Sequence, residues 1–349
     1  MPAGTPYALG RFTGSDGDDF CGAVIGPDVV PLTALHPAAS DIDMLLAAWP
    51  ASEKLLGAAV DAFADGQHGV AGQPGVAGQP GVVSQPGVVS QHGAPAVRKA
   101  SELTPLAPFR PGQIFQSGAN YKTHVVQLMV AAAAEQGDDD PERTLREATA
   151  LMTERAEHGT PYVFVGLPSA VSGPRDDVIL PSTGTKHDWE LELGVVIGTE
   201  AYQVSRDEAL GHVAGYTIVN DITTRDRVFR PDMPGLGTDW LAGKNSPTFL
   251  PLGPWLVPAS FVPEPMDLRI TLKLNGETMQ DETTAGMIFG IAELIAHVSS
   301  ITPLRPGDLL LTGSPAGNGA HYGRYLREGD VMESTITGLG VQRNRCARP

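Results

Sequence analysis

Two glutamates separated by one residue are the sharpest chemical feature of this chain. Glu190 and Glu192 fall in the run HDWELELGVVIG, whose apolar residues indicate a strand. On a strand, residues i and i+2 point to the same face, so the two carboxylates would project side by side. Neighbouring carboxylates repel unless a cation lies between them, and hard cations such as Mg²⁺ prefer oxygen ligands of this kind. The pair alone is equally compatible with a half-exposed strand that carries two solvated carboxylates.

A third carboxylate, Asp221, ends the apolar run GYTIVND. Burying an unpaired carboxylate is costly, so we expect Asp221 to have a partner. That partner is either a metal ion shared with the two glutamates or the guanidinium of Arg225, which follows shortly in the sequence. The residues themselves leave both possibilities open.

Three further stretches carry groups that could take part in chemistry. His124 follows the glycine-containing stretch GANYKT at the predicted start of a helix, where it is either a general base acting on water or simply exposed. Lys244 is a lone lysine in AGKNS, and its setting says little. The stretch TGSPAG, residues 312–317, offers backbone N–H groups to a carboxylate or forms an ordinary turn.

The elements that must position these residues are mainly strands. Apolar runs predict strands over 162–165, 191–197 and 213–222, and alternation with an Asn-Gly turn predicts a hairpin over 267–280. Helices are expected over about 41–63, over 123–158 with a break near Gly137, and over about 288–298. Asp140 is the expected N-cap of the part that follows the break. Because helices do not alternate regularly with strands, we expect an α+β, mainly β fold and not a doubly wound sheet.

A repetitive tract divides the chain. From Gly66 the sequence repeats GQHGVA, GQPGVA, GQPGVV, SQPGVV with a period of six. Each repeat offers only a valine and a small neighbour, which is too little apolar surface for a stacked β-helix and favours a flexible linker. We therefore expect a small N-terminal domain over 1–65, a low-complexity linker over 66–98 and a main domain over 99–349.

Composition excludes several classes of protein. The two cysteines, Cys21 and Cys346, exclude a disulfide scaffold and a cysteine-rich metal site. No apolar run approaches the ~20 residues that span a bilayer, and the start lacks the pattern of a secretory signal. A net charge of −16 disfavours a nucleic-acid partner. We expect a cytoplasmic protein that acts on a small molecule, without nucleic-acid or membrane partners.

Taken in order along the chain, these motifs resemble the fumarylacetoacetate hydrolase family over roughly residues 105–344. The resemblance rests on the Asn-Tyr-x-x-His and Glu-x-Glu stretches and on four further matches. The stretches are Asn120–His124, Glu190 with Glu192, Asn220–Asp226, Lys244, Leu274–Gly276 and Leu311–Pro315. It implies a mixed β-roll or β-sandwich catalytic domain, usually in a homodimer, with a small β-rich N-terminal domain.

The resemblance also implies roles for individual residues. It implies a metal-dependent enzyme that acts on small anionic 2-oxo acids, often 2,4-dioxo acids cleaved at a C–C bond. The implied metal ligands are Glu190, Glu192 and Asp221, for Mg²⁺ or alternatively Mn²⁺ or Ca²⁺. The implied catalytic residues are His124 and Lys244, and the implied substrate-binding residues are Arg225, Tyr121, Thr312, Gly313 and Ser314.

Two positions depart from the family pattern. Many members carry a Glu three residues after the histidine and a Gln three residues after the arginine, where this chain has Gln127 and Val228. A second titratable group could instead come from residues 154–158 or from His321. We expect hydrolysis of an acylpyruvate or fumarylpyruvate. The alternatives are decarboxylation, tautomerisation or hydration of a related 2-oxo acid, or a catalytically poor homologue that binds metal and ligand.

Overall fold

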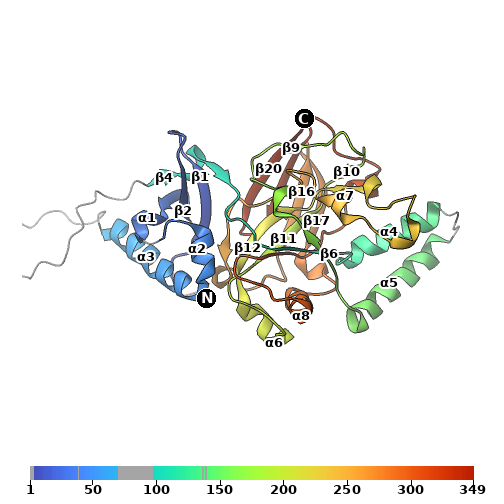
Figure 1. Ribbon diagram of the computed structural model, residues 1–349, viewed down its shortest axis with the longest axis horizontal. Coiled ribbons are helices and arrows are strands. Elements are labelled where there is room, and N and C mark those ends of the chain that lie inside the picture. Colours follow the sequence, from blue (N-terminus) through green and yellow to red (C-terminus); the bar gives the residue numbers. More distant parts are fainter. Residues whose placement is uncertain (1–3, 38, 70–96, 136, 138–139) are drawn as a thin grey trace, which may run out of the picture.

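The structure is a computed structural model that describes residues 4–37, 39–69, 97–135, 137 and 140–349. It has a small N-terminal unit and a larger unit that lie against each other (Figure 1). Most of the expected linker, 66–98, lies outside the described residues, between the end of helix α3 at Gly69 and Val97. Within the described residues, no helix is long and apolar enough to cross a membrane.

The N-terminal unit is a five-stranded sheet covered by helices, in the strand order β4-β3-β2-β1-β5. Strands β1, β2 and β3 of this sheet precede the repetitive tract in the sequence, and β4 and β5 follow it. The expected helix over 41–63 is divided at Ala48. The elements are β1 Ala8–Thr13, β2 Asp19–Ile25, β3 Asp28–Pro31, α1 Leu32–Leu35, α2 Ile42–Ala47, α3 Trp49–Gly69, β4 Arg98–Lys99 and β5 Thr104–Leu106.

A six-stranded sheet in the order β15-β12-β11-β18-β6-β7 forms the centre of the larger unit. Its neighbours are antiparallel except β18 and β6, which pair in parallel. The strands predicted over 162–165, 191–197 and 213–222 all lie in this sheet. Its strands are β6 Ile114–Gly118, β7 Tyr162–Gly166, β11 Leu191–Ile197, β12 Val213–Asn220, β15 Val257–Pro258 and β18 Leu309–Leu311.

A five-stranded sheet in the order β17-β16-β19-β20-β9 packs against the central sheet. Its β16–β17 hairpin turns at Asn275 and Gly276, whose φ angles of 54° and 88° suit an Asn-Gly turn. Its strands are β9 Val178–Ile179, β16 Arg269–Leu274, β17 Glu277–Thr283, β19 Val331–Ile336 and β20 Gly340–Ala347. Two short ladders pair β10 His187–Asp188 with β13 Thr223–Thr224, and β8 Val171–Ser172 with β14 Leu250–Pro251.

Two long helices lie side by side at the end of the molecule away from the N-terminal unit (Figure 1). They are α4 Lys122–Glu135 and α5 Pro141–His158, and the Asp140 side chain caps α5 as its sequence predicts. The helix expected over 288–298 is α8, which begins three residues later, at Ile291, and ends at Ile301. The other helices are α6 Arg206–Ala209, α7 Trp240–Lys244, α8 Ile291–Ile301 and α9 Gly319–Tyr322. Short 3₁₀ turns are η1 Ala100–Glu102, η2 Pro168–Ala170, η3 Leu210–His212, η4 Arg225–Arg227, η5 Pro234–Leu236, η6 Ala259–Phe261 and η7 Thr284–Gly286.

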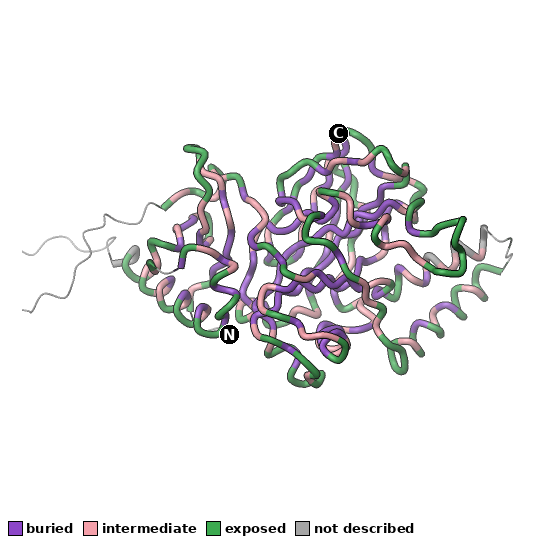
Figure 2. The backbone as a smooth tube through the Cα atoms, viewed as in Figure 1, coloured by how far each residue is buried: buried purple, intermediate pink, exposed green. Residues whose placement is uncertain are grey.

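Both faces of strand β11 are buried, and they face different partners. Leu193 and Val195 pack in the core between the central sheet, the second sheet and α8. Val196, on the opposite face, packs with apolar residues of the N-terminal unit such as Ile42 and Trp49. Figure 2 shows this buried interior running through the larger unit. The alternation assigns Glu192 to the same face as Val196.

Candidate metal and catalytic site

Strand register brings the three predicted carboxylates together. Glu192 is directly opposite Val219 on β12, so Asp221, two residues further on, shares the face of Glu190 and Glu192. The ladder continues through a hydrogen bond from the Asp221 N–H to the Glu190 carbonyl, with an N–O distance of 2.8 Å. One carboxylate oxygen from each residue lies within 4.8 Å of the other two, and all three side chains are buried. The predicted convergence is therefore confirmed.

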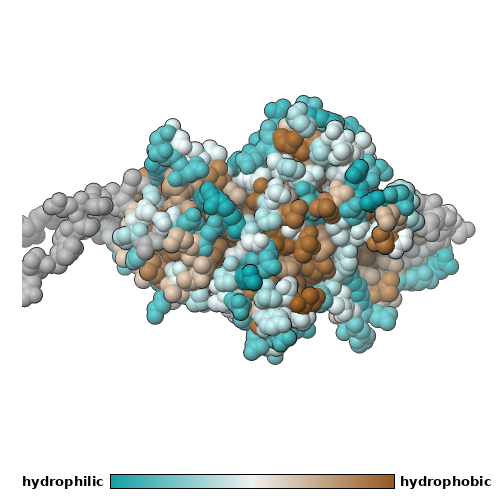
Figure 3. Space-filling view, in the orientation of Figure 1, coloured by the Kyte–Doolittle hydropathy of each residue, from teal (hydrophilic) through white to brown (hydrophobic). Residues whose placement is uncertain are grey.

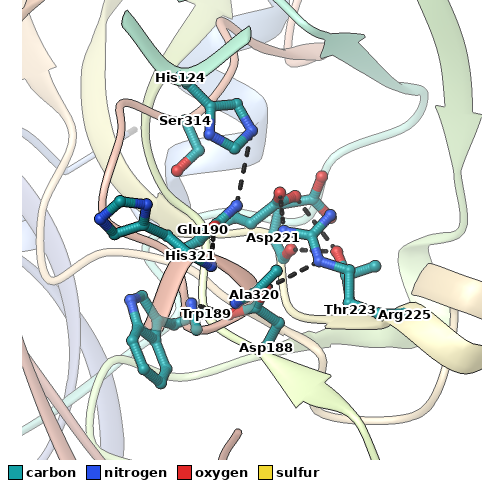
Figure 4. A network of polar contacts seen from close by, with 12 residues as sticks. His124, Asp188, Trp189, Glu190, Asp221, Thr223, Arg225, Ser314, Ala320 and His321 are labelled. Atoms are coloured by element: carbon teal, nitrogen blue, oxygen red, sulfur yellow. Dashed lines mark hydrogen bonds and ion pairs between the residues drawn. The ribbon is translucent and has the colours of Figure 1, made fainter. Parts of the chain in front are cut away.

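Two cations hold these carboxylates from the cavity side. Lys244, the last residue of α7, places its Nζ 2.5 Å from an oxygen of Glu190 and 2.5 Å from one of Asp221. Arg225 binds Asp188 at 2.8 Å and Glu190 at 2.5 Å (Figure 4). Asp221 is thus paired with Lys244, and not with Arg225, which the sequence had left as its alternative partner.

The charges of this cluster do not balance. Asp188, Glu190, Glu192 and Asp221 are all buried, and the cations that touch them in the described chain are Arg225 and Lys244. Two negative charges are left without a protein cation if all four carboxylates ionise. A divalent cation would compensate them.

The pKa values of the carboxylates follow this imbalance. Burial raises the pKa of Asp221 to about 6 even though Lys244 opposes the shift. Burial and the charge of Asp221 also raise the pKa of Glu192. For Glu190, burial is outweighed by Arg225 and Lys244, so its pKa lies below the ordinary value. Glu192 and Asp221 are therefore the carboxylates that most need a further cation.

The loop after β18 holds Glu192 and the backbone of β11 in place through hydrogen bonds. The Gly313 N–H donates to Glu192 at 2.6 Å, and the Thr312 hydroxyl donates to the Leu193 carbonyl at 3.0 Å. Gly313 has a φ of 91°, which favours glycine, and a Cβ there would lie only 2.9 Å from the Cβ of Asn120. Both the backbone conformation and the lack of space therefore favour glycine at this position. The TGSPAG stretch does offer a backbone N–H to a carboxylate, but the carboxylate belongs to the protein itself.

His124 lies on the first turn of α4 and is buried. Its Nε2 lies 3.5 Å from the Asn318 amide nitrogen. The Asn318 amide oxygen accepts the His321 N–H as the cap of α9, which leaves the Asn318 NH₂ group to face the imidazole. Burial lowers the pKa of His124 to about 4. At neutral pH the imidazole is therefore uncharged and able to accept a proton.

These groups open into one cavity of about 370 Å³. One side is polar and carries the carboxylates, the histidine and the two cations, while the other side is mainly aromatic. The polar lining consists of Ser117, His124, Glu190, Glu192, Arg225, Thr238, Lys244 and Ser314. The remaining lining consists of Gly118, Ala119, Tyr162, Phe164, Val228, Phe229 and Trp240.

Comparison with known proteins decides the family. The profile described as "Fumarylacetoacetate (FAA) hydrolase C-terminal" matches residues 113–347, about two thirds of the chain. The chain belongs to the fumarylacetoacetate hydrolase family. The match covers the whole of the larger unit that carries the cavity.

Relatives within this family include enzymes of different reaction types. The chain is 40% identical over 237 residues to a 2,4-didehydro-3-deoxy-L-rhamnonate hydrolase of Sphingomonas sp., covering 67% of this chain and 73% of the relative. It is 36% identical over 248 residues to the human mitochondrial oxaloacetate tautomerase FAHD2A, covering 70% of each. A probable 2-hydroxyhepta-2,4-diene-1,7-dioate isomerase of Mycobacterium abscessus superposes with a TM-score of 0.66 at 29% identity, covering 98% and 99% of the two chains. The expected mainly β fold of the fumarylacetoacetate hydrolase type is thus confirmed.

Some of the site residues implied by the family resemblance line the cavity, and the others lie behind its surface. His124, Glu190, Glu192, Arg225, Lys244 and Ser314 line the cavity, whereas Tyr121, Asp221, Thr312 and Gly313 do not. Tyr121 is fully buried in the core, and its hydroxyl has no hydrogen-bond partner among the described residues. Thr312 and Gly313 hold β11 and Glu192 as described above.

The candidates for the second titratable group lie away from the cavity lining. Glu157 on α5 is exposed, and its carboxylate lies 3.8 Å from the His158 Nε2. Gln127 and His321 line a separate cavity, together with Glu282. His321 is close enough to His124 to lower its pKa further, although burial is the larger cause. The structure therefore places no carboxylate from residues 154–158 beside His124.

Sequence reasoning missed several residues of the site. Asp188 accepts hydrogen bonds from Arg225 and from the Gly319 N–H, and Gln116 donates to Asp221 at 2.6 Å. Asp188 precedes Glu190 by two residues, the same spacing that singled out Glu192. Gln116 is a polar residue inside an apolar strand, which was an available signal.

Proposed function

We propose that this protein is a divalent-metal-dependent enzyme that hydrolyses a C–C bond in a small 2,4-dioxo acid of the acylpyruvate type. The observation that carries the proposal is the set of three buried, converging carboxylates whose charge two cations do not balance. The name of the Sphingomonas relative, which describes hydrolysis of a 2,4-didehydro sugar acid, agrees with it.

The donor set fits a hard divalent cation. Glu190, Glu192 and Asp221 supply only oxygen ligands, which suit Mg²⁺, Mn²⁺ or Ca²⁺. When bound there, such an ion would supply Lewis-acid stabilisation to negative charge on a 2-oxo acid. Among the described residues, the carboxylate cluster contains neither sulfur nor imidazole ligands, so soft metals are disfavoured.

His124 is the proposed general base. Its uncharged imidazole takes a proton from water, and the resulting hydroxide adds to the distal carbonyl carbon, C4. The C3–C4 bond then breaks, releasing a carboxylic acid and the enolate of pyruvate. The proton held by His124 returns to C3 of that enolate, so atoms and charge balance.

Lys244 and Arg225 supply fixed positive charge at the polar end of the cavity. Lys244 Nζ is held between two carboxylates, and Arg225 is held by Asp188 and Glu190. Because these cations are already in place, little reorganisation is needed when negative charge develops on the substrate. Ser314, which also lines the cavity, offers a hydroxyl to the substrate carboxylate.

Tautomerisation is the second candidate reaction. The oxaloacetate tautomerase relative matches 70% of this chain, and Gln127 stands where many hydrolysing members carry a glutamate. In this reaction His124 would move a proton between C3 and the enol oxygen of a 2-oxo acid without breaking a C–C bond.

One assay panel separates these reactions. Loss of enol absorbance is followed for acylpyruvates and for oxaloacetate, with Mg²⁺ and with EDTA, and pyruvate is quantified separately. Hydrolysis predicts pyruvate release from acylpyruvates that EDTA abolishes and that Glu192→Gln lowers by at least 100-fold, whereas the exposed control Glu277→Gln keeps full activity. Pyruvate release from oxaloacetate alone would indicate decarboxylation. Enol loss without pyruvate release would instead assign tautomerisation.

The assembly and the compartment remain predictions. The homodimer expected from the resemblance is checked by sedimentation of the purified chain. The expected cytoplasmic location is checked by fractionation of cells that express it.

A further inference from the structure

The side of the cavity opposite the carboxylates is a preformed aromatic wall. Tyr162 and Phe164 project from the same face of β7, and Trp240 begins α7. The Trp240 and Phe164 rings stack with centroids 4.4 Å apart and an interplanar angle of 12°. The Trp240 indole N–H donates to the Tyr162 hydroxyl at 2.7 Å. These contacts fix the indole on its face and at its edge, so the wall is ordered before a substrate arrives.

This wall begins next to the carboxylate cluster. The Lys244 Nζ lies 5.6 Å from the Phe164 ring centroid and 5.8 Å from that of Trp240. Trp240 and Lys244 are four residues apart on α7, and both line the same cavity. A small acid bound by its 2-oxo acid end at the carboxylate cluster would therefore lay its next carbon atoms against the aromatic rings.

Among the described residues that line the aromatic side of the cavity, none is a cation that could pair with a second acidic group. The arginine and the lysine that line the cavity, Arg225 and Lys244, are both engaged by carboxylates at its polar end. Val228 and Phe229 complete the apolar side. Arg230, in the adjoining surface cavity, is bound by Asp232 at 2.6 Å. A distal carboxylate would face the negative faces of aromatic rings without a compensating charge.

We propose that this aromatic wall, defined by Tyr162, Phe164 and Trp240, selects substrates whose distal group is uncharged and apolar. Acylpyruvates with an aliphatic or aromatic acyl group are then preferred over those that end in a second carboxylate, such as fumarylpyruvate. The inference rests on the proposed function, because it assumes that the 2-oxo acid end lies at the carboxylate cluster. Figure 3 shows brown patches among hydrophilic residues on the side of the molecule where α4 and α7 lie.

A matched pair of substrates tests the charge term. Crotonylpyruvate and fumarylpyruvate differ only by a methyl group in place of a carboxylate. We expect kcat/KM for crotonylpyruvate to be at least tenfold higher. Along the series acetyl-, butanoyl- and hexanoylpyruvate, kcat/KM should rise about fourfold for each added methylene until the cavity is filled. Equal or higher kcat/KM for fumarylpyruvate, or a flat series, would overturn the inference.

Variants test whether the wall is responsible. Trp240→Ala should flatten the chain-length series, and Trp240→Phe should keep most of it, while circular dichroism confirms that both fold. Val228→Arg places a cation on the apolar side and should narrow the crotonyl-to-fumaryl ratio. The matched control is Leu241→Ala, which removes the exposed neighbour of Trp240 outside the cavity lining and should leave the series unchanged. An unchanged series in Trp240→Ala would contradict the assignment.

Binding without turnover separates this inference from the proposed hydrolysis. Calorimetry in the presence of Mg²⁺ compares 2-oxohexanoate with 2-oxoadipate, which have the same chain length but end in a methyl group and a carboxylate. Tighter binding of 2-oxohexanoate, without hydrolysis of any acylpyruvate, would retain the selective wall and reject the hydrolase. Hydrolysis with tighter binding of 2-oxoadipate would do the reverse. Failure of both ligands to bind, together with no hydrolysis of any acylpyruvate, would reject both.

Discussion

Replacing Lys244 with methionine should make the folded protein depend on a divalent cation. The ammonium group is buried and lies 2.5 Å from each of two carboxylates, so it is the positive charge that holds Glu190 and Asp221 together in this structure. Methionine keeps much of the side-chain volume and removes the charge. The cluster would then keep four buried carboxylates with Arg225 as its single cation in the described chain.

The expected loss of stability follows from the burial of this pair. Removing one partner of a buried ion pair typically costs about 3–5 kcal/mol, far more than the ~0–1 kcal/mol of an exposed pair. Proton uptake limits that loss, because burial already raises the pKa of Asp221 to about 6 and the variant should raise it further. The folded variant then binds more protons than the unfolded chain, so its stability falls as pH rises. The loss should therefore be larger at pH 8 than at pH 5.5.

The assay is thermal and urea unfolding of the two proteins with EDTA and over a Mg²⁺ titration. Without metal, Lys244→Met should melt about 10 °C below wild type at pH 8, at roughly 2–4 °C per kcal/mol. Mg²⁺ should stabilise the variant more than wild type, since Lys244 no longer shares the same oxygens, and a concentration of 100 Kd contributes about 2.7 kcal/mol. The control Lys273→Met removes an exposed lysine of β16 and should change neither the melting temperature without metal nor the stabilisation by Mg²⁺. Equal Mg²⁺ stabilisation of Lys244→Met and wild type would refute this account of the cluster.

Four further perturbations follow from the same contacts. His124→Ala should lower kcat by about 10²–10⁴-fold, because the proposed general base is lost. Calorimetry should show unchanged Mg²⁺ affinity, because His124 is not one of the clustered carboxylates. A wild-type rate would reject His124 as the base. As pH falls from 6.5 towards 4, the free energy of unfolding of wild type should fall by up to about 3 kcal/mol relative to His124→Gln. The cause is that the His124 pKa of about 4 in the folded protein lies below the ordinary 6.5, so the unfolded chain takes up the proton first. An equal pH dependence of the two free energies in urea unfolding would contradict the buried neutral imidazole. Asp188→Asn should cost about 2–4 kcal/mol in urea unfolding because Arg225 loses a buried partner, and a loss below 0.5 kcal/mol would show that the pair contributes little. Gln127→Glu should leave turnover unchanged or lower it, because position 127 shares its cavity with Glu282, and a faster enzyme would show instead that the missing glutamate limits the rate.

The sequence was sufficient for residues on regular strands or directly next to them, as Glu190 precedes β11 and Asp221 follows β12. The i, i+2 spacing of Glu190 and Glu192 and the position of Asp221 at the end of an apolar run translate directly into one face of one sheet. The same reasoning found β7, β11 and β12 of the central sheet, the β16–β17 hairpin and the cap of α5. Such features depend on local periodicity and on single residues with strong positional preferences.

Partnerships between distant segments were beyond such local reasoning. Nothing near Lys244 in the sequence indicates that its ammonium group lies between Glu190 and Asp221, because α7 reaches the sheet through an irregular segment that follows β13. For the same reason the sequence offered Arg225 to Asp221, whereas the fold pairs it with Asp188 and Glu190. The aromatic wall was missed because Trp240 and Phe164 come from different elements and meet only in the folded chain.

The division between sheet and loop segments also explains how related enzymes with one scaffold can catalyse different reactions. The carboxylates are fixed by strand register, which a loop substitution does not alter, so the capacity to bind a cation and an acid is set by the sheet. Lys244 and Trp240, the wall residue that stacks on Phe164, instead depend on α7, a helix of five residues whose start is fixed by the Asp239 side chain accepting the Ala242 N–H at 3.0 Å. Substitutions in this short segment can change the distal contacts and the position of the cation while the carboxylate cluster stays in place. Membership of the family over the larger unit therefore agrees with a shared carboxylate cluster. The reaction and the acyl preference that we propose depend on the residues around it, in the loops, α7 and β7.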